Sequence, residues 1–76
     1  MVYGMYYYQR LRDLREDRDL TQADISAYLG MKQPQYNRYE TGMRELPLHH
    51  LVALCKFYNV SADYILGLTD DFRALK

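Results

Sequence analysis

Residues 22–40, QADISAYLGMKQPQYNRYE, decide the fold, because this stretch contains the starts of two short helices and the turn between them. Thr21 stands directly before it and Asp24 follows three residues later, which is the spacing of a capping box, with Asp in place of the usual Glu. Gly30 is placed to end the first helix in a left-handed conformation, which glycine adopts without a Cβ clash. Pro34 is tolerated only in the first turn of a helix, so a second helix is predicted to begin just before it.

Apolar side chains recur every three or four residues on both sides of this stretch, as is typical of amphipathic helices. Five helices are predicted: about 6–18, 21–29, from 33 to 42, from Pro47 through Tyr58, and from Ser61 to Gly67. The expected inward-facing residues are Tyr7, Leu11 and Leu14; Ile25 and Leu29; Tyr36 and Tyr39; Leu51, Leu54, Cys55 and Tyr58; and Tyr64, Ile65 and Leu66. Since no strand pattern interrupts them, the sequence predicts a compact all-α domain over 10–68, between a tyrosine-rich leader at 1–9 and a frayed tail at 69–76.

The length and the cysteine content restrict what can stabilise this domain. Seventy-six residues form one domain, and so short a chain buries only about 60% of its unfolded surface. The one cysteine, Cys55, cannot close an internal disulfide, and a buried, inert thiol in a reducing cytoplasm is expected. His49 and His50 give no zinc-ligand spacing with it, so neither a metal nor a cofactor is expected. No segment resembles a signal peptide or approaches the roughly 18 apolar residues of a membrane span, which predicts a cytoplasmic protein without a membrane partner.

The charges are balanced overall but unevenly distributed. Ten basic and ten acidic side chains give a net charge of zero, whereas proteins that bind nucleic acid usually carry a basic excess. Between residues 30 and 44, however, there are three basic residues, Lys32, Arg38 and Arg44, and a single acidic one, Glu40. The sequence therefore allows a locally basic face on a neutral protein.

The two short helices and their glycine turn fit a helix-turn-helix, a motif with specific steric demands. The first helix needs a small residue where it faces its partner, and Ser26 meets this demand. The turn needs a glycine, which Gly30 supplies. The apolar inner faces are formed by Ile25, Leu29, Met31, Tyr36 and Tyr39. Because all these features occur in one register, they favour this motif together more strongly than any of them does alone.

Further residues extend the match beyond the motif. They are Leu14-Arg15, Leu20-Thr21-Gln22, Tyr28-Leu29-Gly30, Arg38-Tyr39-Glu40-Thr41-Gly42, Arg44-Glu45-Leu46-Pro47-Leu48 and Tyr58-Asn59-Val60-Ser61-Ala62-Asp63-Tyr64-Ile65-Leu66-Gly67. With them the sequence resembles the Cro/C1-type (XRE-like) helix-turn-helix family over about residues 10–68. The resemblance implies a five-helix, lambda-repressor-like domain that binds double-stranded DNA sequence-specifically and regulates transcription, with repression expected.

The resemblance also assigns expected roles to individual residues. The second helix of the motif would lie in the major groove, with base contacts from Lys32, Gln33, Pro34, Asn37 and Arg38. Phosphate contacts would come from Gln22, Thr41, Gly42 and Arg44. Arg15 and Glu40 would form a structural pair between the first and third helices. Three residues depart from the family's pattern: Pro34 replaces a usually polar residue, Tyr36 replaces a smaller aliphatic one, and Ser26 replaces the more usual alanine.

Several alternatives remain open on the sequence alone. A protein-interaction module, such as an antitoxin or adaptor, could keep this fold without binding DNA. A positive face formed by Lys32, Gln33, Asn37 and Arg38 would favour DNA, and an apolar tyrosine patch there would favour a protein partner. A homodimer is expected, formed in solution or only on DNA. The leader tyrosines Tyr3, Tyr6, Tyr7 and Tyr8 could cover the core, frame a dimer contact or reach DNA. Neither a catalytic arrangement nor a small-molecule ligand is evident, so an enzyme is not expected.

Overall fold

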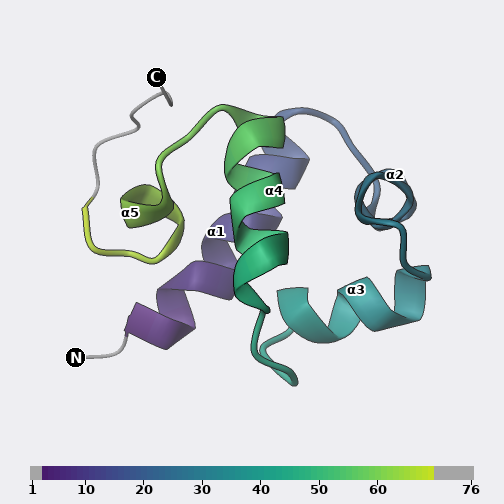
Figure 1. The fold of residues 1–76 in the computed structure, drawn as a ribbon, viewed down its shortest axis with the longest axis horizontal. Coiled ribbons are helices and arrows are strands. Elements are labelled where there is room, and N and C mark those ends of the chain that lie inside the picture. Colours follow the sequence, from purple (N-terminus) through teal and green to yellow (C-terminus); the bar gives the residue numbers. More distant parts are fainter. Residues whose placement is uncertain (1–2, 70–76) are drawn as a thin grey trace.

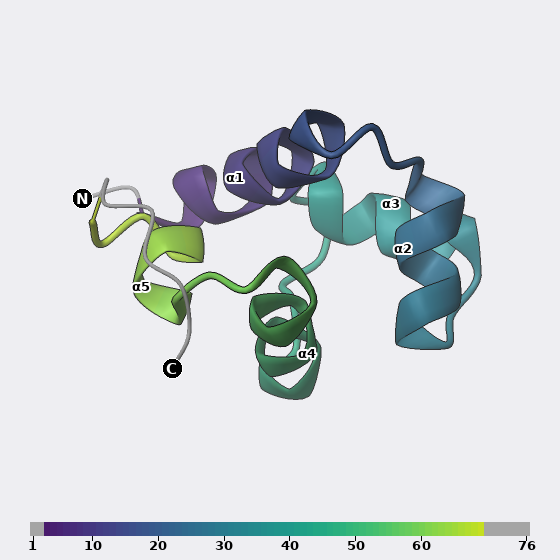
Figure 2. The same cartoon turned by 90° about the horizontal axis from the view of Figure 1, so that it is seen from above.

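The computed structural model describes the backbone of residues 3–69 and the side chains of residues 7–69. Its helices are α1 (Tyr3–Asp17), α2 (Gln22–Leu29), α3 (Gln33–Glu40), α4 (Leu48–Tyr58) and α5 (Ala62–Ile65). Residues 3–69 contain no strand, which confirms the all-α prediction. Two views at right angles place α2 and α3 at one end of the molecule and α5 at the other (Figures 1 and 2).

The predicted helix ends are confirmed around the motif. The Thr21 hydroxyl accepts from the Asp24 amide at 3.1 Å, and the Asp24 carboxylate accepts from the Thr21 amide at 2.8 Å, so both bonds of the capping box are made. Gly30 ends α2 with φ +72°, in the left-handed region. Pro34 lies in the first turn of α3, as expected.

The first helix differs from the prediction at its start. It begins at Tyr3, not near Tyr6, so most of the expected leader continues the helix that carries Leu11 and Leu14. Tyr7 is buried, and Tyr8 packs against the core from a half-buried position. Of the alternatives for the leader, Tyr7 and Tyr8 therefore cover the core, whereas the side chains of Tyr3 and Tyr6 lie outside the described residues.

One apolar core joins all five helices. Its buried members are Tyr7, Leu11, Leu14, Ile25, Tyr36, Tyr39, Leu51, Leu54, Cys55, Tyr58, Val60 and Ile65. They include the predicted stripe of α4, and burial raises the pKa of the Cys55 thiol, which keeps it protonated and unreactive at neutral pH.

Two arginines of the first helical segment tie the C-terminal helices to it. The Arg10 guanidinium lies 4.2 Å from the centre of the Tyr64 ring and donates to the carbonyls of Tyr64 (2.9 Å) and Thr69 (2.7 Å). Arg18, just beyond α1, donates to the carbonyl of Tyr58 at 3.0 Å. Helix C-termini leave carbonyls unsatisfied, so these contacts both satisfy backbone groups and hold α4 and α5 in place.

Candidate nucleic-acid interface

Helix α3 has one buried face and one polar exposed face. Tyr36, Tyr39 and Glu40 point into the molecule, and Tyr36 is fully buried, so the tyrosines of α3 form no surface patch. The exposed residues at its start and along its outer face are Lys32, Gln33, Pro34, Gln35 and Arg38, while Asn37 is half-buried. Four of the five expected base-contacting residues are therefore accessible, and Gln35 is an exposed position that the sequence reasoning did not single out.

A chain of hydrogen bonds connects the first residues of α2 and α3. The Gln33 side-chain amide donates to the Gln22 carbonyl oxygen at 3.1 Å. The Gln22 side-chain amide in turn donates to Asn37 Oδ1 at 3.0 Å and to Glu40 Oε1 at 3.1 Å. Gln33 keeps its own carbonyl oxygen and one N–H for another partner, which is the acceptor and donor pair that adenine complements in the major groove. The Asn37 side-chain amide keeps its two N–H donors for another partner.

This arrangement changes the expected role of Gln22. The family resemblance assigned both its side chain and the nearby amides to a phosphate, but the side chain is engaged inside the protein. Its backbone amide and that of Ala23 lie in the first turn of α2 and have no acceptor among residues 3–69. Free amides and the helix dipole make such a terminus suited to an anion, so the backbone of Gln22, more than its side chain, fits the phosphate role.

The chain of hydrogen bonds ends at the Arg15–Glu40 pair. Arg15 Nε and Nη2 donate to the two Glu40 oxygens, each at 2.9 Å, and Nη1 donates to the Leu20 carbonyl at 2.8 Å. The Glu40 side chain is only 2% exposed. Burial alone would raise its pKa, but the hydrogen bonds from Arg15 and Gln22 outweigh it and hold the Glu40 pKa below the ordinary value. The carboxylate is therefore charged, and its charge is neutralised inside the protein.

The segment between α3 and α4 folds back on the end of α3. The amides of Thr41, Gly42 and Arg44 donate to the carbonyls of Asn37 (2.9 Å), Tyr39 (3.3 Å) and Arg38 (3.0 Å). These amides are thus not free for a phosphate, contrary to the expectation for the backbone around Thr41 and Gly42. The exposed donors of this segment include the Arg44 side chain and the amides of Met43 and Glu45, which have no acceptor within the described residues.

Two contacts from α1 reach the same segment and were not predicted. Tyr7 hydrogen-bonds to its backbone, and the Tyr8 ring covers Gly42, whose φ is +81°. No local sequence pattern reveals them, because more than thirty positions separate the partners. The only hint in the sequence was Tyr7 at the start of the predicted apolar stripe.

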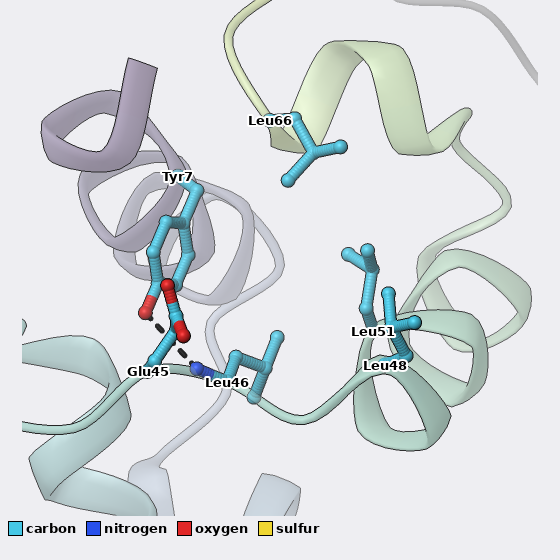
Figure 3. A pocket seen from close by; sticks show the side chains of 6 residues that line it. All are labelled: Tyr7, Glu45, Leu46, Leu48, Leu51 and Leu66. Carbon is cyan, nitrogen blue, oxygen red and sulfur yellow. Dashed lines mark hydrogen bonds between the residues drawn. The ribbon is translucent and has the colours of Figure 1, made fainter. Parts of the chain in front are cut away.

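A small apolar pocket lies elsewhere, between α1, the segment before α4, and the last helices (Figure 3). It has a volume of about 240 Å³ and is lined by Tyr7, Glu45, Leu46, Leu48, Leu51 and Leu66. None of the candidate DNA-contacting residues is among them. Within residues 3–69, no cluster of three or more possible metal ligands occurs and no helix is long and apolar enough to cross a membrane.

The comparisons with known proteins agree with this geometry. Three relatives are similar to this chain. The first, described as an uncharacterized HTH-type transcriptional regulator YobD of Bacillus subtilis (strain 168), is 46% identical over 65 residues, which cover 86% of this chain and 58% of that protein. The second, an uncharacterized HTH-type transcriptional regulator YqaE of the same strain, is 34% identical over 76% of this chain and 50% of its own length. The third, the cryptic phage CTXphi transcriptional repressor RstR of Vibrio cholerae, is 37% identical over 67% of this chain and 46% of its own length.

The chain thus spans about half the length of the curated relatives it matches. No solved structure gives a significant match. The sequence profile described as Helix-turn-helix matches residues 11–65, which include all of α2, α3 and α4 and the turn that Gly30 makes. The protein therefore belongs to the helix-turn-helix family.

Proposed function

We propose that this protein binds double-stranded DNA sequence-specifically and regulates transcription, with α3 in the major groove. The observation that carries the proposal is the hydrogen-bond chain from Gln33 through Gln22 to Glu40. It fixes the first residues of α2 and α3 relative to each other, so that a phosphate-binding helix terminus and a base-contacting side chain are held in one geometry. Such preorganisation reduces the side-chain ordering that binding would otherwise require.

The exposed face of α3 supports direct contact with base edges. Gln33 can pair with adenine, and Lys32 or Arg38 can reach guanine O6 or N7. Pro34 offers no donor but can make an apolar contact with a thymine methyl group, which is another way to distinguish bases. Each good bidentate pair contributes about 1–3 kcal/mol of discrimination. The names of the relatives, which include a repressor, support regulation of transcription as the outcome of binding and repression as its direction.

The proposal includes a homodimer, a cytoplasmic location and the absence of enzymatic activity. Proteins with this motif bind two half-sites about 34 Å apart, so two copies are needed to contact a palindrome. The relatives come from bacteria, where DNA and its regulators share the cytoplasm.

A second candidate is a protein-interaction role, and one observation favours it. Tyr28, Val52 and Phe57 are 48%, 51% and 37% exposed, and the rings of Tyr28 and Phe57 lie 4.5 Å apart. This apolar patch is formed by residues of α2 and α4 and includes none of the exposed residues of α3. The DNA-binding role is preferred because the patch leaves the polar face of α3 uncovered.

Selection from a random double-stranded DNA library tests the two roles. The native chain is compared with Gln33→Ala plus Arg38→Ala, and the matched control is Gln9→Ala plus Arg12→Ala, which removes the same side chains from an exposed part of α1. We expect a palindromic site to be enriched by the native chain and the control, and lost with the α3 variant at unchanged helical content. Equal enrichment by all three proteins would show that Gln33 and Arg38 do not read the DNA, and no enrichment at all would favour the interaction role.

A further inference from the structure

The segment that links α3 to α4 carries Arg44, an expected phosphate contact, but has few internal constraints of its own. One amide bond, from Arg44 to Arg38, holds Arg44 to the end of α3. The Arg44 side chain is exposed, so its position depends on the backbone that carries it. Helix α1 supplies further constraints, through two adjacent tyrosines.

Tyr7 fixes the backbone on both sides of Glu45. Its hydroxyl accepts from the Leu46 amide at 3.0 Å and donates to the Arg44 carbonyl at 3.3 Å (Figure 3 shows the first of these bonds). The Tyr7 side chain is buried, so these bonds compete little with water. A single hydroxyl therefore satisfies the carbonyl of Arg44 and the amide of the second residue after it.

Tyr8 fixes the other end of the segment. Its ring lies so close to Gly42 that a Cβ added there would be 2.7 Å from Cε1 and Cζ of the ring. Gly42 also has φ +81°, a conformation that other residues adopt only with strain. The Tyr7 and Tyr8 rings meet edge to face, 5.6 Å apart at 82°, so each ring restricts the other.

We propose that Tyr7 and Tyr8 are positioning residues for DNA binding: they hold the segment 42–46 so that Arg44 meets a backbone phosphate. This inference rests on the proposed function and extends it to Tyr7 and Tyr8 of α1, which cover the core and are not among the expected base or phosphate contacts. The ligand is the phosphodiester backbone, independent of sequence, so the effect should appear in the salt dependence of binding and not in the choice of base.

The salt dependence of binding to the selected site tests the inference. The main comparison is between the native protein, Tyr7→Phe, Arg44→Met, and the double variant that combines these two changes. Tyr7→Phe removes both hydrogen bonds and keeps the ring. The matched control is Tyr28→Phe, which removes a single hydroxyl bond, 3.2 Å to the Ala53 carbonyl, on a different face. A further variant, Tyr8→Leu, removes the ring that lies against Gly42. Circular dichroism establishes that each protein is folded.

We expect Arg44→Met to reduce the slope of log affinity against log salt by about 0.9, the value for one phosphate contact. Tyr7→Phe should lower affinity roughly 2- to 10-fold, because both bonds that position the Arg44 backbone are lost. It should also reduce the salt slope, but by less than Arg44→Met does. In the double variant the Tyr7→Phe change should have no further effect, since its influence passes through Arg44. Tyr8→Leu should behave like Tyr7→Phe, and Tyr28→Phe should keep the native slope.

Two different failures are distinguishable. If the native chain shows no salt-dependent DNA binding, the proposed function itself is wrong. If the native chain binds and Arg44→Met reduces the slope, but Tyr7→Phe and Tyr8→Leu keep the native slope or add fully to Arg44→Met, only the positioning role is overturned. Lower thermal stability with an unchanged slope would likewise mean that these tyrosines contribute to the core alone.

Discussion

Removing one member of the Arg15–Glu40 pair should cost more stability than removing both. Arg15→Met leaves the Glu40 carboxylate, 2% exposed, with the Gln22 amide as its remaining side-chain donor. Glu40→Met leaves the Arg15 guanidinium, 13% exposed, facing a methionine. Breaking a buried pair in this way costs about 3–5 kcal/mol, whereas exchanging both partners for apolar residues is often neutral or stabilising.

The magnitude is large for so small a protein. At about 0.05–0.15 kcal/mol per residue, 76 residues give a free energy of unfolding of about 4–11 kcal/mol. Each single variant should therefore lose about a quarter or more of the total, and its melting temperature should fall by at least about 12 °C. The double variant forfeits the bond from Arg15 to the Leu20 carbonyl and leaves Gln22 without its Glu40 acceptor, at about 1 kcal/mol each. We therefore expect it to be more stable than either single variant.

Urea unfolding followed by circular dichroism measures the four free energies, with unchanged m-values establishing that all four proteins unfold in the same way. A double variant as unstable as the sum of the two singles would refute the reasoning, because it would mean that the two side chains act independently. The folded double variant also isolates the functional part of the pair. It should bind DNA more weakly than the native chain, since Gln22 is no longer held by Glu40.

Three further predictions concern single features. Gly30→Ala should destabilise the protein by about 1–2 kcal/mol, because Gly30 has φ +72°, although no atom lies near enough to clash with a Cβ. Gly30→Asn should cost less, since asparagine adopts this conformation more readily than alanine. Thermal unfolding measures both losses, and equal losses would contradict the prediction. Tyr58→Phe should raise the free energy of unfolding by up to about 1–3 kcal/mol, and the melting temperature with it, because the buried Tyr58 hydroxyl has no hydrogen-bond partner among residues 3–69. The ring contact with Arg18 at 5.1 Å is retained. A lower melting temperature would show that the hydroxyl is in fact satisfied. Stability should fall in two stages on acidification. Burial, and secondly His49, lower the pKa of His50, and hydrogen bonding lowers that of Glu40, so the unfolded state binds more protons below about pH 6.5 and again below about pH 4.3. Urea midpoints from pH 8 to pH 3 measure both stages. The lower stage should be smaller in the Arg15→Met, Glu40→Met variant, where only Asp24, whose pKa is lowered by its hydrogen bonds with Thr21, still contributes to it.

The helix boundaries could be predicted because their determinants are local. The capping box at Thr21, the left-handed Gly30 and the early Pro34 each act within a few residues, and each appears in the structure as expected. The core stripes could be predicted for the same reason, since helical periodicity fixes which side chains share a face. The start of α1 was misplaced because the run of tyrosines before Tyr7 carries no capping signal.

The contacts between distant residues could not be derived from local patterns. The Arg15–Glu40 pair, 25 positions apart, was expected only from the family resemblance. The internal use of the Gln22 side chain was missed, since an exposed-looking glutamine at a helix start gives no indication of its partner. The internal bonding of the Thr41 and Gly42 amides was also missed. The family resemblance assigned this backbone to phosphates, whereas α3 ends at Glu40 and these amides satisfy carbonyls of its last turn.

The contact between Arg10 and Thr69 has a consequence for how this domain can be extended. It anchors the backbone after α5 beside α1, at the end of the molecule opposite α2 and α3 (Figures 1 and 2). The relatives are longer than the region they share with this chain. The backbone that follows α5 at Thr69 therefore lies remote from α3, the helix proposed to contact DNA. Changes at this end of the domain can be made separately from changes to the exposed face of α3.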